Sequence, residues 1–100
     1  MSGKIKVFIE ADLEPIIPRF FELRRADIQT IAESLEKGDF ETIKRLGHSM
    51  KGSGGGYGFD RISEIGREIE EAAANKDIGR ITLSRDELAD FLDNVEVVYE

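Results

Sequence analysis

The chain of 100 residues has no cysteine and a single histidine, His48. Without cysteine there is no disulfide framework, and one histidine leaves a zinc site of the usual kind short of ligands. The chain also lacks any run near the about 20 apolar residues of a transmembrane helix, and no signal peptide is evident after Met1. We therefore expect a soluble, cytoplasmic protein.

Positive charge is scarce as well. Fourteen Lys and Arg residues face 21 Asp and Glu residues, which gives a formal net charge of −7. Such a charge opposes binding to nucleic acid and to anionic membrane surfaces, so neither is an expected partner. The length and the 40% apolar composition fit one compact domain that spans residues 1–100.

Proline is limited to Pro15 and Pro18, which leaves most of the chain free to form helices. Because proline is tolerated only near a first turn, we expect a short N-terminal turn, capped by Asp12, that bends near Pro18 before a longer helix. Residues 1–11 read as an extended segment, since apolar and polar side chains alternate there. This segment either pairs with the β-branched tail around Val97 or lies over one end of the molecule.

Beyond Pro18 the apolar residues recur with helical spacing in four segments. Gly38 and Asp39 separate the first two, because glycine suits the residue after a helix end and aspartate caps the next helix. Asp60 is the candidate cap of the third helix, and 75–77 is a turn before the fourth. Short connections predict an all-α, antiparallel up-down four-helix bundle. The residues expected to face its core are Leu13, Ile16, Ile17, Phe20, Phe21, Ile28, Ile31, Leu35, Phe40, Ile43, Leu46, Gly47, Met50, Ile62, Ile65, Gly66, Ile69, Ala73, Ile81, Leu88, Phe91, Leu92 and Val95.

His48 is predicted to point to solvent, about 150° from the centre of the apolar face of its helix. Its helical neighbours are Lys44, Arg45, Lys51 and Gly52, so three cations flank one imidazole in an acidic chain. An exposed, neutral ring can act as a nucleophile, and the cations can offset the charge of a phosphoryl group. Gly52 leaves room for a partner to approach. Periodicity alone also fits an ordinary solvated histidine.

The segment from His48 to Ser53 resembles the phosphoacceptor motif of histidine phosphotransfer domains. His48 takes the place of the acceptor, Met50 the apolar position, Lys51 and Gly52 the lysine–glycine pair, and Ser53 the small hydroxyl residue. The resemblance is specific over residues 46–70 and extends to the rest of the chain only as a bundle. It departs from the family pattern at Phe59 and at 54–56, three consecutive glycines that we expect to end the helix or form its loop.

The resemblance implies a phosphotransfer module of a two-component phosphorelay, without kinase activity of its own. Such a module accepts a phosphoryl group on His48 from a receiver-domain aspartate or a hybrid sensor histidine kinase and passes it to another receiver. It implies no cofactor on this chain, because the Mg²⁺ for the reaction belongs to the receiver. Lys44, Arg45, Lys51, Gly52 and Ser53 are then expected to support the phosphoryl group or the partner. We expect a monomer, although extended terminal segments could pair between chains.

Other functions fit less well. A Walker loop requires Gly-Lys before Ser or Thr at the head of a helix, whereas Lys51 precedes Gly52 near a helix end. A di-iron bundle requires Glu-x-x-His pairs, but Arg45 stands three residues before the only histidine. The remaining alternative is a bundle that docks on signalling proteins without being phosphorylated.

Overall fold

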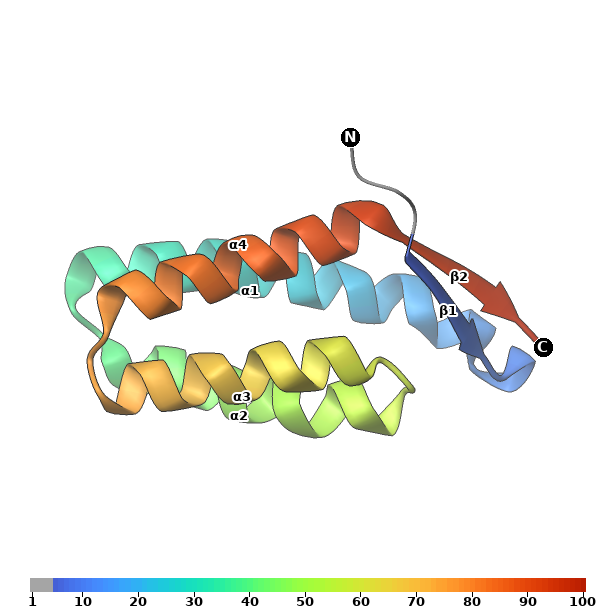
Figure 1. Ribbon diagram of the computed structural model, residues 1–100, viewed down its shortest axis with the longest axis horizontal. Coiled ribbons are helices and arrows are strands. Elements are labelled where there is room, and N and C mark those ends of the chain that lie inside the picture. Colours follow the sequence, from blue (N-terminus) through green and yellow to red (C-terminus); the bar gives the residue numbers. More distant parts are fainter. Residues whose placement is uncertain (1–4) are drawn as a thin grey trace.

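The computed structural model describes residues 5–100; residues 1–4, the start of the expected extended segment, lie outside the described part. Its elements follow in the order β1 (Ile5–Ile9), a 3₁₀ helix (Ala11–Ile16), α1 (Ile17–Lys37), α2 (Phe40–Gly56), α3 (Asp60–Ala74), α4 (Ile78–Asn94) and β2 (Val95–Tyr99). Each long helix packs on the next, and α1 also packs on α4, which closes an antiparallel four-helix bundle (Figure 1). The predicted fold class is confirmed.

Helix ends follow from local chemistry. Gly38 adopts a left-handed backbone (φ 68°) and donates its N–H to the carbonyl of Leu35, which ends α1. Asp39 then caps α2 by accepting from the backbone N–H of Thr42, and Asp77 caps α4 in the same way. The predictions for Gly38, Asp39 and the turn at 75–77 are thus confirmed.

Two predicted caps are wrong. Asp12 lies inside the 3₁₀ helix, whose N-cap is Glu10, and neither residue forms a side-chain cap. Asp60 is the first residue of α3 rather than its cap, since Phe59 occupies the cap position with its side chain buried. Burial of a phenyl ring outweighs a capping hydrogen bond, which is worth about 1 kcal/mol.

The core follows the predicted stripes in most places. Ile31, Ile43, Ile65, Ile69, Ile81 and Leu88 are completely buried, and Phe59 stacks on Phe20 with ring centroids 5.7 Å apart. Ile16 is the clear exception at 43% exposed, because the helix register changes between the 3₁₀ turn and α1. Val95 packs against the core from β2 instead of from a helix.

The two terminal strands pair with each other, which the sequence left open. β1 and β2 are parallel, with Val7 opposite Val97 and Ile9 opposite Tyr99. The direction follows from the bundle, because α4 and β1 both run toward the end at which the chain turns back into α1 (Figure 1). Val7, Ile9, Val95, Val97 and Tyr99 pack against the core, so the sheet covers one end of the bundle.

Glycines permit α2 and α3 to pack unusually closely. A Cβ atom at Gly47 would lie 2.6 Å from the backbone nitrogen of Glu70, and one at Gly66 would lie 2.6 Å from that of Lys51. Gly54 is equally close to the start of α3, where its Cβ would lie 2.6 Å from the nitrogen of Ser63. The helix therefore continues through 54–56 and ends at Gly56, at the last of the three glycines.

Candidate functional site

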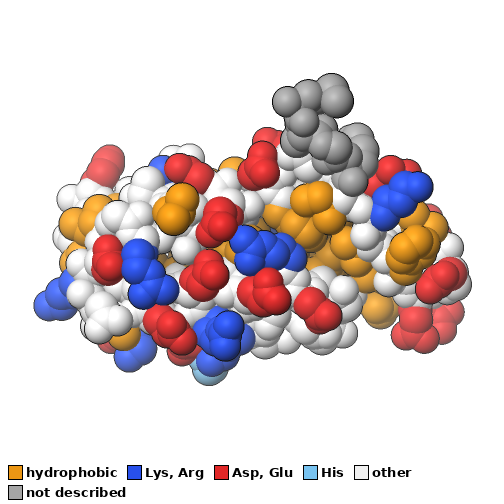
Figure 2. Space-filling model, viewed as in Figure 1, with side chains coloured by type: hydrophobic (Ala, Val, Ile, Leu, Met, Phe, Trp, Pro, Cys, Tyr) orange, Lys and Arg blue, Asp and Glu red, His pale blue; other side chains and the backbone are white. Residues whose placement is uncertain are grey.

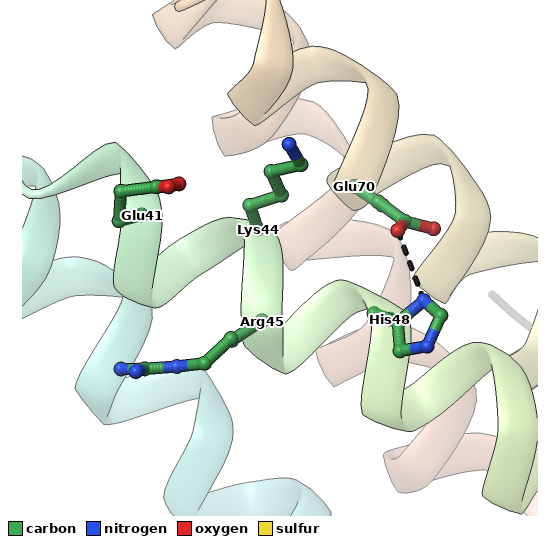
Figure 3. A pocket seen from close by; sticks show the side chains of 5 residues that line it. All are labelled: Glu41, Lys44, Arg45, His48 and Glu70. Atoms are coloured by element: carbon green, nitrogen blue, oxygen red, sulfur yellow. Dashed lines mark hydrogen bonds and ion pairs between the residues drawn. The ribbon is translucent and has the colours of Figure 1, made fainter.

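His48 lies near the middle of α2, on the side that faces away from the core. Its side chain is 69% exposed. The imidazole is thus reachable from solvent. The site around it combines residues of α2 with Glu70 of α3, which projects from the neighbouring helix toward the ring (Figure 3).

Glu70 contacts both His48 and Lys51. Its Oε2 lies 3.0 Å from Nδ1 of His48, and its Oε1 lies 2.9 Å from Nζ of Lys51. The hydrogen bond from Lys51, reinforced by that from His48, holds the pKa of the Glu70 carboxyl below its ordinary value although partial burial opposes the shift. Glu70 is therefore an ionised acceptor that orients both side chains.

The contact with Glu70 determines which ring nitrogen of His48 is free. An ionised carboxylate can only accept hydrogen bonds, so Nδ1 of His48 must carry the proton. In the neutral ring the lone pair then belongs to Nε2, on the side of the ring away from Glu70 (Figure 3). One nitrogen is held and the other remains available as a nucleophile.

The predicted cations are not equally placed. Lys51 is tied to Glu70, and Lys44 lines a hollow of about 430 Å³ together with Glu41, Arg45, His48 and Glu70. Arg45 turns away from the ring and donates to the hydroxyl of Thr42, 3.3 Å away (Figure 3). The structure therefore holds Lys51 near the imidazole through Glu70, whereas Lys44 shares only the hollow with His48 and the Arg45 guanidinium points toward the start of α2.

Gly52 and Ser53 lie on different sides of the helix. A Cβ atom at Gly52 would have no atom within 4 Å, so this surface is open to solvent. Ser53 faces α1, where its hydroxyl accepts from Arg24 at 2.8 Å and donates to the carbonyl of Ser49 at 3.0 Å. Ser53 thus connects α2 to α1 rather than to the imidazole.

A groove of about 350 Å³ separates the start of α1 from this part of α2. Its walls include Phe20, Tyr57 and the exposed side chains of Ile16 and Leu23. Apolar side chains left exposed at the rim of a groove are typical of surfaces that contact another protein.

Two further kinds of site were sought among the described residues, a metal-binding cluster and a membrane-spanning helix. No three His, Cys, Asp or Glu side chains within residues 5–100 are arranged to hold a metal ion. Across that same range, no helix has the length and apolar character needed to span a bilayer. On the face that carries α4, charged side chains of both signs alternate with groups of hydrophobic side chains (Figure 2).

Glu70 is the residue to which sequence reasoning assigned no role. It is the last residue of the segment 46–70 that resembles the phosphotransfer family, but helical periodicity identifies neighbours along one helix and not across two. A glutamate on α3 at the same height as His48 is recognisable only once Gly47 and Gly66 set the register between the helices. The sequence signal was therefore the pair of glycines together with an acidic residue one turn after Gly66.

Comparison with protein-family models gives a match to the Hpt domain model over residues 16–98. No curated protein and no solved structure matches the chain significantly. The match covers all four long helices and includes every residue of the site described above.

Proposed function

The chain belongs to the Hpt domain family, and on that basis we propose that it relays a phosphoryl group through His48. Hpt domains are phosphotransfer modules of two-component systems that interact with receiver domains and kinases. The finer proposal is that His48 accepts the group from a receiver aspartate or a hybrid sensor histidine kinase and passes it to another receiver aspartate. The protein has no kinase activity of its own in this scheme and acts in the cytoplasm as a monomer.

One observation carries the proposal: the imidazole is exposed, with Nδ1 held by Glu70 and Nε2 free. The lone pair of Nε2 attacks the phosphorus of the receiver's aspartyl phosphate. The N–P bond forms as the P–O bond to the aspartate breaks, and the aspartate leaves as a carboxylate. The proton stays on Nδ1 throughout, so the ring becomes cationic and the Glu70 carboxylate stabilises it.

Two lysines suit the phosphoryl oxygens. Lys51 is held beside the ring by Glu70, and Lys44 lines the hollow next to it. Both ammonium groups are able to offset negative charge that arrives with the phosphoryl group. The Mg²⁺ that such a transfer needs would be held by the receiver, and this chain would require no cofactor.

The surface around His48 suits a docked receiver. Gly52 leaves the helix surface bare one turn after the acceptor, so the partner's active site can reach in-line distance. The groove beside it offers the apolar side chains of Ile16 and Leu23 for contact. Arg45 is directed outward near the start of α2 and is available to a partner's acidic groups.

The proposal is tested with a phosphorylated receiver as donor. Wild-type protein should acquire label that is lost in acid, as expected of a phosphoramidate, and His48→Gln should acquire none. Glu41→Gln, on the same helix and facing the same hollow, is the matched control and should be labelled normally. Equal labelling of His48→Gln would place the acceptor elsewhere.

A second test addresses docking. Gly52→Leu should leave the fold intact, since a side chain there meets nothing, but should slow transfer because it obstructs the partner. Chemical phosphorylation of His48 by phosphoramidate, a small donor, should be unaffected. Transfer at the wild-type rate would contradict the proposed docking surface.

An interaction module without phosphorylation is the alternative. It would bind receivers as tightly with His48→Gln as with wild type and would never be labelled. The arrangement of Glu70 favours the relay, because a docking protein has no need to fix the tautomer of an exposed imidazole.

A further inference from the structure

The only charged residue that is buried within residues 5–100 is Arg24 of α1, at 8% exposed. Its guanidinium lies 5.1 Å from the centre of the Phe20 ring and reaches across to α2. Burying the Arg24 charge costs desolvation free energy, so its contribution to stability alone does not explain its position.

Arg24 belongs to a series of polar contacts that ends at Ser49, the residue next to His48. Nε of Arg24 lies 2.9 Å from Oδ2 of Asp27, but this contact is poorly aligned and neither atom has a hydrogen bond. The well-aligned bond is from Nη1 to the hydroxyl of Ser53, which in turn donates to the carbonyl of Ser49. We call Asp27, Arg24, Ser53 and Ser49 the Arg24 network.

Asp27 is the half-buried partner of Arg24 in the network. Burial raises the pKa of its carboxyl although the nearby Arg24 charge opposes the shift. The hydrogen bond of the guanidinium goes to Ser53, and Asp27 offsets part of the buried charge of Arg24.

The part of α2 that Ser53 belongs to is weak as a helix. Gly52 and the three residues 54–56 are glycines, each of which costs about 1 kcal/mol relative to alanine. This stretch is nevertheless helical to Gly56. It is held from both sides, because Ser63 of α3 donates to the carbonyl of Lys51 at 2.6 Å while Arg24 of α1 binds Ser53.

We infer that Arg24 is a positioning residue for phosphotransfer: through Ser53 it keeps the glycine-rich end of α2 helical, so that Lys51 and the bare surface at Gly52 stay in register with His48. This inference rests on the proposed function. It assigns a role to a residue 24 positions before the acceptor in the sequence, which no part of the acceptor motif contains.

Two variants remove the network while preserving packing. Ser53→Ala removes the hydroxyl that accepts the hydrogen bond from Arg24. The double variant Arg24→Met with Asp27→Leu replaces the buried guanidinium and its half-buried carboxylate partner by apolar side chains of similar size, a change that is often neutral or stabilising. Two matched controls change similar residues outside the network. Ser84→Ala alters a buried serine of α4, and Arg25→Met alters an arginine of α1 that contacts Asp93 of α4.

The first measurement is amide hydrogen exchange. The N–H of Tyr57 donates to the carbonyl of Ser53 and that of Phe59 to the carbonyl of Gly54, so both report on this end of α2. Exchange at these two amides should be about tenfold faster in either network variant and unchanged in the controls. Unchanged exchange in the network variants would overturn the inference.

The second measurement is single-turnover transfer from a phosphorylated receiver. The maximal rate should fall about tenfold in either network variant, because Lys51 and the surface at Gly52 lose their register with His48 in the docked complex. Adding Ser53→Ala to the double variant should cause no further loss, since Arg24 acts through Ser53. A wild-type maximal rate, or losses that add, would refute the role. If the wild-type protein is never labelled, the proposed function fails instead, and the exchange measurement still decides whether Arg24 holds α2.

Discussion

Alanine at Gly66 and alanine at Gly52 should change stability in opposite directions. A Cβ atom at Gly66 would lie 2.6 Å from the nitrogen of Lys51 and 2.7 Å from the carbonyl oxygen of Gly47, whereas ordinary contact begins at 3.4 Å. Because backbone atoms cannot rotate away, α3 must move outward by about 0.8 Å to accept the methyl group, and such overpacking costs about 1–3 kcal/mol.

The magnitude follows from two opposing terms. At Gly66 a cost near the upper limit, about 3 kcal/mol, is reduced by the about 1 kcal/mol that alanine gains over glycine in a helix. The net loss of about 2 kcal/mol should lower the melting temperature by about 10 °C in a domain of this size. At Gly52, where nothing lies within 4 Å, only the gain of about 1 kcal/mol remains, so this variant should melt about 5 °C higher.

Thermal and urea unfolding followed by circular dichroism at 222 nm measure both changes. The outward movement of α3 should also carry Glu70 away from His48 and Lys51, so Gly66→Ala should transfer more slowly than its residual stability explains. If Gly66→Ala unfolds within about 0.5 kcal/mol of the wild type, the close packing of α2 on α3 is not a constraint and the reasoning is wrong. Equal shifts for the two variants would contradict it as well.

Three further predictions use other parts of the molecule. Because the folded pKa of Glu70 is lowered, its contribution to stability should be complete above its ordinary value of 4.5 and disappear as pH falls through the lowered value; the difference in unfolding free energy between wild type and Glu70→Gln should therefore shrink below pH 4.5. Lys76→Gly should stabilise by about 0.5 kcal/mol in urea unfolding, since Lys76 adopts a φ of 53° that glycine tolerates better; a loss would mean that its side chain contributes more than its backbone costs. Phe59→Ala should destabilise by about 3–5 kcal/mol, while Leu83→Ala, at an exposed position, should change little; similar effects at both would place Phe59 outside the core.

Much of the molecule followed from rules that act within a few residues. Helical spacing predicted four helices, Gly38 and Asp39 marked the first boundary, and the same spacing placed His48 on the outer side of its helix. Asp60 was misassigned as a cap because the burial of Phe59, a tertiary effect, determined where α3 begins. Such signals succeed where a residue's state depends on its immediate neighbours along the chain.

The site needed more than local rules. Glu70 reaches His48 across 22 positions, and Arg24 reaches Ser53 across 29, so both contacts depend on how the helices are aligned against each other. That alignment comes from glycines that let α2 and α3 approach, and from burial of side chains that no short window of sequence can pair. The exposed His48 and the nearby Lys51 are one helical turn apart, so the sequence alone predicted them. Nε2 of His48 is the free nitrogen only because a second helix supplies the Glu70 carboxylate that binds Nδ1.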